Sequence, residues 1–85
     1  MSYRVDYLES VVRKDISTLD KTTCVRIRRE IERKLMVDPI KFGKPLQYSL
    51  KGCRRLRVGD WRIIYVVAGF VVTIVKIGHR REIYD

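Results

Sequence analysis

The chain has 85 residues and carries 19 lysines and arginines against 10 aspartates and glutamates, for a net charge of +9 and a pI near 10.0. This length predicts a single domain over residues 1–85 and excludes a second one, and the positive surplus favours polyanionic partners. No run approaches 18 apolar residues and the N-terminus has no signal-peptide core, so we expect a cytoplasmic protein with no membrane association.

The first part of the chain changes from a strand pattern to a helical one. Residues 3–7 alternate between apolar and charged side chains, which is typical of a short strand with one covered face. Residues 8–19 place apolar side chains at helical spacing among charged ones. A second helix, capped by Thr22 or Thr23, is predicted to continue to Leu35 and to end at the Asp-Pro pair that follows. The short connection predicts an antiparallel helical hairpin.

A sheet is predicted to follow the helices. Residues 38–52 hold both prolines and two glycines and are expected to form a loop. Residues 54–58 and 61–67 are then strands joined by the turn Gly59-Asp60, a good fit to type II′, and residues 70–77 form a third strand after an Ala-Gly turn. The order predicts an α+β fold, with an N-terminal strand, a helical hairpin and a three-stranded antiparallel meander, and with the helices on one face of the sheet.

The register of the first hairpin predicts a face crowded with positive charge. If Gly59 and Asp60 form the turn, Arg57 lies opposite Arg62, and Arg55 emerges on the same side. Like charges directly opposite each other cost a few tenths to about 1 kcal/mol. A phosphodiester held by the arginine forks would relieve that repulsion, and a merely solvated face is the alternative.

The other face of the sheet is predicted to pack on the helices. Its expected core residues are Leu56, Ile63, Tyr65, Val67, Phe70, Val72 and Ile74. Several apolar side chains share the arginine side instead, so we expect the C-terminal segment or a partner peptide to cover its centre.

The last residues bring further polar groups to the end of the third strand. His79, Arg80, Arg81 and Tyr84 follow it closely, and the register predicts that they lie near the hairpin arginines. The unperturbed pKa of an imidazole suits general acid-base catalysis, which is one interpretation of His79. The equal alternative is an exposed imidazole at a strand end with no catalytic role. A tyrosine near a terminus is more often a packing residue than a catalyst, but a phosphate site beside it favours the second role.

The two cysteines suggest no special chemistry. Cys24 and Cys53 form no CxxC arrangement, and His79 is the one histidine of the chain. Two buried, reduced cysteines are therefore predicted, with neither a disulfide framework nor a metal site and with no cofactor.

Two blocks of this sequence resemble the RelE branch of the RelE/ParE toxin superfamily. One comprises Leu50-Lys51-Gly52 and the stretch from Arg55 to Tyr65, and the other runs from Ile77 to Tyr84. The resemblance covers the whole chain in length and element order and implies a single RelE-like β-α-α-β-β-β domain. It implies the toxin of a type II toxin-antitoxin system, an endoribonuclease (mRNA interferase) that cuts messenger RNA at the ribosome without a metal and so inhibits translation.

The resemblance also implies a chemistry and the residues that perform it. A ribose 2′-hydroxyl attacks the neighbouring phosphate and leaves a 2′,3′-cyclic phosphate and a 5′-hydroxyl. Arg55 or Arg57, with Arg62 and Arg80, would stabilise the charge on the phosphorane. Tyr84 would stack on a base, orient the phosphate or protonate the leaving oxygen. The basic residues assigned to substrate binding are Lys51, Arg54, Arg57 and Arg81.

One departure from the family concerns the general base. Well-studied members carry lysines where Arg55 and Arg57 stand, and a lysine there is assigned that role. Arginine, with a pKa above 12, is a poor base. The proton must go elsewhere or the enzyme is slow, and His79 is the candidate.

Two other function classes remain open at this point. ParE-like relatives share the fold, lack the catalytic cluster and poison DNA gyrase, and a simple RNA-binding module would bind phosphates without turnover. The family resemblance further implies a co-encoded, RelB-like antitoxin that forms a hetero-oligomer with the toxin. We expect acidic and apolar antitoxin residues to dock on the arginine face or to displace the C-terminal segment.

Overall fold

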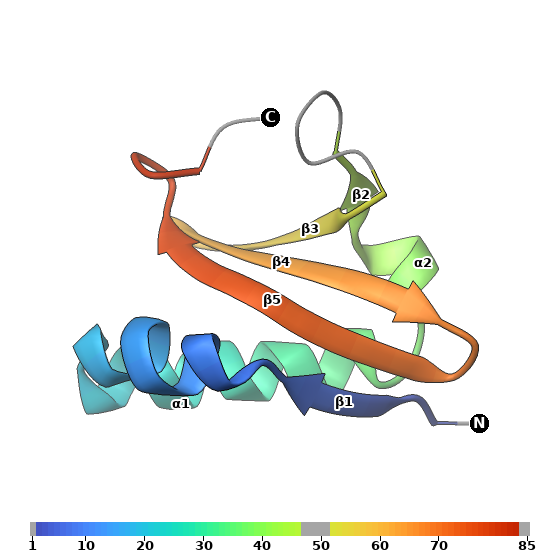
Figure 1. Cartoon of the computed structure of the whole chain (residues 1–85), viewed down its shortest axis with the longest axis horizontal. Coiled ribbons are helices and arrows are strands. Elements are labelled where there is room, and N and C mark those ends of the chain that lie inside the picture. Colours follow the sequence, from blue (N-terminus) through green and yellow to red (C-terminus); the bar gives the residue numbers. More distant parts are fainter. Residues whose placement is uncertain (1, 47–51, 84–85) are drawn as a thin grey trace.

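A mixed sheet with helices packed against one face forms the architecture (Figure 1). The computed structural model describes residues 2–46 and 52–83. Within them the sheet has five strands in the order β1-β5-β4-β3-β2. The strands are β1 (Arg4–Tyr7), β2 (Lys44–Pro45), β3 (Arg54–Val58), β4 (Trp61–Ala68) and β5 (Val71–His79). The helical segments are Val11–Asp15 and Ile16–Thr18, then α1 (Lys21–Glu30) continued by Ile31–Leu35, and finally α2 (Pro39–Phe42).

The α+β prediction and the helical hairpin are confirmed, but the predicted cap of the second helix is wrong. Asp20 caps α1, and its carboxylate accepts the backbone N–H of Thr23 at 3.2 Å. The backbone of Asp20 is extended, with ψ at 163°, which directs its side chain over the first turn. Thr22 and Thr23 therefore lie inside the helix. Of the helices described, none offers the length of apolar residues that a bilayer crossing requires.

The segment predicted as a loop over residues 38–52 contains regular structure, so that prediction is wrong in part. Asp38 accepts the N–H of Lys41 at 3.1 Å, and Pro39 occupies the first turn, where its missing N–H costs nothing. These two features start the short helix α2. Strand β2 follows and pairs with the beginning of β3, which places Lys44 beside Arg55.

The meander forms with the predicted register in its first hairpin. Arg57 pairs with Arg62, and Arg55 pairs with Ile64. Gly59 has a φ of +59°, which a two-residue turn at this position requires. Strand β1 adds to the free edge of β5 in parallel, from Arg4 opposite Val71 to Tyr7 opposite Ile74, so the sheet is mixed.

The core lies between the helices and one face of the sheet, largely as predicted. Its buried members are Val11, Ile27, Ile31, Leu35, Leu56, Val58, Ile63, Tyr65, Val72, Ile74 and Ile77. Phe70 is an error of the prediction, because it belongs to the turn before β5, is 56% exposed and contacts Tyr3 instead. The cysteines were predicted to be buried, but Cys24 and Cys53 are each half-buried.

One hydrogen bond ties the sheet to the α2 region. The hydroxyl of Tyr65, which is fully buried, donates to the carbonyl of Pro39 at 2.6 Å. Gly43 leaves the space for this ring, because a Cβ there would coincide with the Tyr65 hydroxyl. Burial raises the pKa of Tyr65, so the neutral phenol is the form that the fold favours.

We predict that Tyr65→Phe lowers the free energy of unfolding by about 1–3 kcal/mol, because it leaves a buried carbonyl without its donor. Urea denaturation followed by circular dichroism measures this change. Tyr7→Phe is the matched control, since the Tyr7 hydroxyl makes no hydrogen bond within residues 2–46 and 52–83. Equal stability losses in the two variants would contradict the assigned role of Tyr65.

Candidate functional site

Three arginines of the β3–β4 hairpin lie on the face of the sheet opposite the helices, and a fourth, Arg80, follows β5 next to the hairpin turn. Arg57 and Arg62 are directly opposite each other in the β3–β4 ladder, and Arg55 lies two residues along β3 on the same face. Burial lowers the pKa of Arg62, and the positive charges of Arg57, Arg55 and Arg80 lower it further. These mutual effects indicate a shared positive site at the hairpin end of the sheet. We call these four residues the arginine cluster.

The hairpin turn anchors two members of the cluster. Arg62 donates from the same Nη atom to the carbonyls of Gly59 and Trp61, each at 3.0 Å. The backbone N–H of Arg80 donates to the carbonyl of Asp60 at 2.7 Å, and Arg80 Nε lies 3.6 Å from the Asp60 carboxylate. The turn thus brings a residue of β4 and a residue that follows β5 to one point.

The C-terminal segment covers part of the arginine face, as predicted. Gly78 pairs with Arg62 across β4 and β5. A side chain at position 78 would therefore lie on the same side of the sheet as Arg62. A Cβ at Gly78 would stand 2.9 Å from the Ile83 side chain. Ile83 therefore packs directly on the sheet at this position. Ile64, which shares this face, is only 1% exposed.

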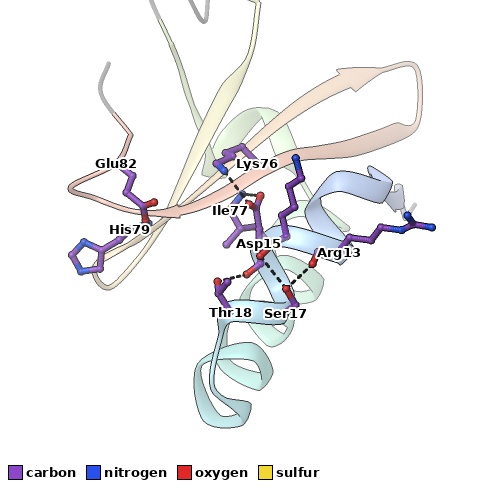
Figure 2. A network of polar contacts seen from close by, with 9 residues as sticks. Arg13, Asp15, Ser17, Thr18, Lys76, Ile77, His79 and Glu82 are labelled. Atoms are coloured by element: carbon purple, nitrogen blue, oxygen red, sulfur yellow. Dashed lines mark hydrogen bonds and ion pairs between the residues drawn. The ribbon is translucent and has the colours of Figure 1, made fainter.

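A single carboxylate fixes the edge of β5 before it reaches the cluster (Figure 2). Asp15, at the end of the first helical segment, accepts the backbone N–H of Ile77 and the ammonium of Lys76, each at 2.9 Å. The Asp15 side chain is only 8% exposed. The pairing of β1 with β5 ends at Ile74, so β1 offers no acceptor to the later residues of β5. The Asp15 carboxylate accepts the backbone N–H of Ile77 instead.

His79 lies on the helix side of the sheet, away from the arginine face. It pairs with Trp61, and the two rings meet edge to face with centroids 5.5 Å apart. The Nδ1 atom of His79 accepts the backbone N–H of Arg81 at 3.2 Å. The backbone N–H of His79 donates to the Glu82 carboxylate at 3.1 Å (Figure 2). An imidazole whose Nδ1 accepts a hydrogen bond carries its proton on Nε2 when neutral.

A β-bulge explains why sequence spacing misplaced His79. Tyr65 pairs with Ile74, whereas Ile64 pairs with Lys76, so Val75 is an extra residue in β5. Beyond Val75 the alternation of faces is inverted. Ile77 therefore lies in the core, and His79 lies on the same helix-facing side of the sheet. Simple alternation would have placed His79 on the arginine face.

The remaining predicted site residues are dispersed. Arg54 points to the helix side, where one Nη atom donates to the carbonyls of Ile40 at 2.6 Å and Gly43 at 2.8 Å, so it holds the α2 region. Arg81 is exposed after the last strand. Lys51 and Tyr84 lie outside the described residues.

Two residues near the cluster were not singled out from the sequence. Arg26 of α1 reaches the hairpin turn from the helix side, because its guanidinium lies 3.0 Å from where a Cβ of Gly59 would stand. Asp60 supplies a carboxylate to the cluster itself. The Gly-Asp turn was the available signal for Asp60, and no sequence feature marks Arg26.

The arrangement is suited to holding a phosphate. Guanidinium groups are planar donors that match phosphate oxygens, and here four of them share one surface whose own repulsion an anion would relieve. Within residues 2–46 and 52–83, no three histidine, cysteine or acidic side chains gather as metal ligands.

Comparison with known proteins finds relatives that match nearly the whole chain. The family model for the ParE toxin of the type II toxin-antitoxin system, parDE, matches residues 7–84. Toxin RelG of Mycobacterium tuberculosis is 28% identical over 86 residues, covering 99% of this chain and 98% of RelG. The RelBE2 toxin-antitoxin complex of the same organism contains a chain with 26% identity and a TM-score of 0.86, with 94% of this chain and 93% of that chain covered. The archaeal RelE-RelB complex from Pyrococcus horikoshii gives 31% identity and a TM-score of 0.65, with coverages of 94% and 97%.

We predict opposite effects of Arg57→Gln on stability and on anion binding. At low salt the substitution raises the free energy of unfolding by a few tenths to about 1 kcal/mol, because it removes the repulsion with Arg62. It also weakens binding of a labelled single-stranded oligonucleotide, because one phosphate donor is lost. Urea denaturation and fluorescence anisotropy measure the two effects.

The control is Arg4→Gln, which removes an exposed arginine of β1 that pairs with Asp6 at the far edge of the sheet. It should leave oligonucleotide binding nearly unchanged and bring no gain in stability. If Arg57→Gln and Arg4→Gln behave alike, the arginine cluster is not a phosphate site.

Proposed function

The chain belongs to the ParE toxin family, within the RelE/ParE superfamily of type II toxins, and we propose that it is an RNA-cleaving member of the RelE kind. The observation that carries this proposal is the arginine cluster. A toxin that acted only by occupying a protein surface would have no need to place like charges opposite each other, as Arg57 and Arg62 are. Charge of this density on one face fits a phosphodiester.

The proposed reaction is a metal-independent transesterification. The ribose 2′-oxygen bonds to the adjacent phosphorus, and the bond from phosphorus to the 5′-oxygen breaks, which leaves a 2′,3′-cyclic phosphate and a 5′-hydroxyl. Negative charge grows on the phosphoryl oxygens during this step. Arg55, Arg57, Arg62 and Arg80 would stabilise that charge, because donors already gathered near the phosphate need little reorganisation during the reaction.

The proposed substrate is messenger RNA on the ribosome, and its cleavage would inhibit translation. The exposed end of the sheet at the Gly59–Asp60 turn is where RNA would approach the cluster. Tyr84, next to the C-terminus, would orient the phosphate or protonate the leaving 5′-oxygen. His79 is a less suitable base than its sequence position suggested, because its ring lies against Trp61 on the other side of the sheet.

We further propose a co-encoded, RelB-like antitoxin as the protein partner. The solved structures of the M. tuberculosis RelBE2 and P. horikoshii RelE-RelB relatives are toxin-antitoxin complexes. A net charge of +9 favours an acidic partner. The contact of Ile83 with Gly78 covers only part of the arginine face, so antitoxin residues that displace this segment would reach the cluster directly.

Inhibition of DNA gyrase is the second candidate function. It is favoured by the family model, whose description names the ParE toxin. The arginine cluster favours RNA cleavage over it.

We predict that brief expression of the wild-type chain in a bacterial host produces new 5′ ends in messenger RNA, detected by primer extension. Arg62→Ala should reduce cleavage by at least about 100-fold, in the range known for loss of one transition-state donor. Tyr84→Phe tests the terminal tyrosine in the same assay. Cleaved ends should carry a 2′,3′-cyclic phosphate.

The control variant is Arg33→Ala, which removes an exposed arginine from the helical hairpin, where it pairs with Glu30. It should cleave like the wild type. Intact messages together with accumulating DNA breaks would instead support gyrase poisoning and end the nuclease proposal.

A further inference from the structure

The Gly59–Asp60 turn places one carboxylate within the arginine cluster. Asp60 Oδ1 lies 3.6 Å from Arg80 Nε, and the carbonyl of the preceding Gly59 accepts from Arg62 at 3.0 Å. The backbone carbonyl of Asp60 also holds the N–H of Arg80 at 2.7 Å. The turn therefore holds Asp60 close to the two arginines that the proposed chemistry needs.

The Asp60 side chain is also accessible. It is 63% exposed, and among the described residues it forms an ion pair with Arg80 at 3.6 Å. The neighbouring carboxylate, Glu82, is instead engaged by the backbone N–H of His79 at 3.1 Å. Among the described residues, Asp60 is thus the acidic group that RNA would meet at the cluster.

Within residues 2–46 and 52–83, no other side chain at the cluster is placed to accept a proton. Arginine stays protonated at all physiological pH values, so Arg55, Arg57, Arg62 and Arg80 act as donors only. The imidazole of His79 faces the helix side. A carboxylate is a competent general base at neutral pH, because it is ionised there.

We propose that Asp60 is the general base that removes the proton from the attacking ribose 2′-hydroxyl. The inference rests on the proposed ribonuclease function and names a catalytic residue for it. A scissile phosphate that binds Arg62 and Arg80 draws Arg80 from the carboxylate, which frees Asp60 beside the sugar. The hairpin turn then serves to hold the base next to the phosphate donors.

The step balances without any further reagent. Asp60 takes the 2′-hydroxyl proton as the bond from the 2′-oxygen to phosphorus forms. The bond from phosphorus to the 5′-oxygen breaks with its electron pair, and the 5′-oxygen takes a proton from water. Asp60 then returns its proton to solvent.

The test is single-turnover cleavage of end-labelled messenger RNA bound to purified bacterial ribosomes, with the whole chain and its Asp60→Asn variant. The variant should cleave at least about 100-fold more slowly, which is within the contribution of a general base. It should bind a non-cleavable RNA, with a 2′-deoxyribose at the scissile position, at least as tightly as the wild type does, because a negative charge is lost from a phosphate site. A slower step with unweakened binding is a signature that misfolding does not produce.

The pH dependence provides a second readout. The wild-type rate should fall at acidic pH as the base becomes protonated, and the remaining activity of Asp60→Asn should lack this limb. Glu82→Gln is the matched control, because it removes a carboxylate from the same region and keeps an acceptor for His79. It should cleave at the wild-type rate with the wild-type pH profile.

The outcomes separate this inference from the proposed function. An active wild type with an equally active or faster Asp60→Asn variant overturns the role of Asp60 and leaves the nuclease intact. Weaker RNA binding by Asp60→Asn with an unchanged rate of cleavage when saturated also overturns it. A wild type that binds ribosomes and leaves the RNA uncut overturns both.

Discussion

The repulsion between Arg57 and Arg62 is the interaction on which the site depends. The two-residue Gly59–Asp60 turn sets the register of β3 and β4, and this register leaves the two guanidiniums opposite each other. Packing alone would not favour such a pair, because like charges across a ladder destabilise it. The structure adds Arg55 and Arg80 to the same surface and so increases the repulsion. A bound phosphate group would relieve this repulsion, which is why we propose the cluster as the functional site.

The helix-facing side of the sheet holds the strands in place against the repulsion between the arginines. Core side chains from both helices pack on β3, β4 and β5, and buried Tyr65 connects the sheet to the α2 region. Asp15 holds the edge of β5 where β1 no longer pairs with it (Figure 2). Arg80 comes only a few residues after this part of β5, and its backbone N–H donates to the Asp60 carbonyl. The position of the last cluster member is thus determined by helix, sheet and turn together.

Sequence periodicity predicted the parts of this structure that are set by local rules. The turn at Gly59 and the alternation of faces were enough for the β3–β4 register and for three of the four cluster members. The fourth, Arg80, was placed near the hairpin by its position in the chain and by the family resemblance. The face of His79 could not be predicted, because the bulge at Val75 inverts the alternation and leaves no sequence signature. Tertiary contacts likewise decided the role of Arg54 and the parallel pairing of β1 with β5.

We propose that guanidiniums from β3, β4 and the segment after β5 act together on one phosphate. A structure of the protein on a ribosome-bound messenger RNA, with a 2′-deoxyribose at the cleavage position, would show where that phosphate binds. We expect it within hydrogen-bonding distance of Arg62 and Arg80, with Arg55 or Arg57 as a third donor. RNA bound along the helical hairpin, with the cluster left in solvent, would contradict it.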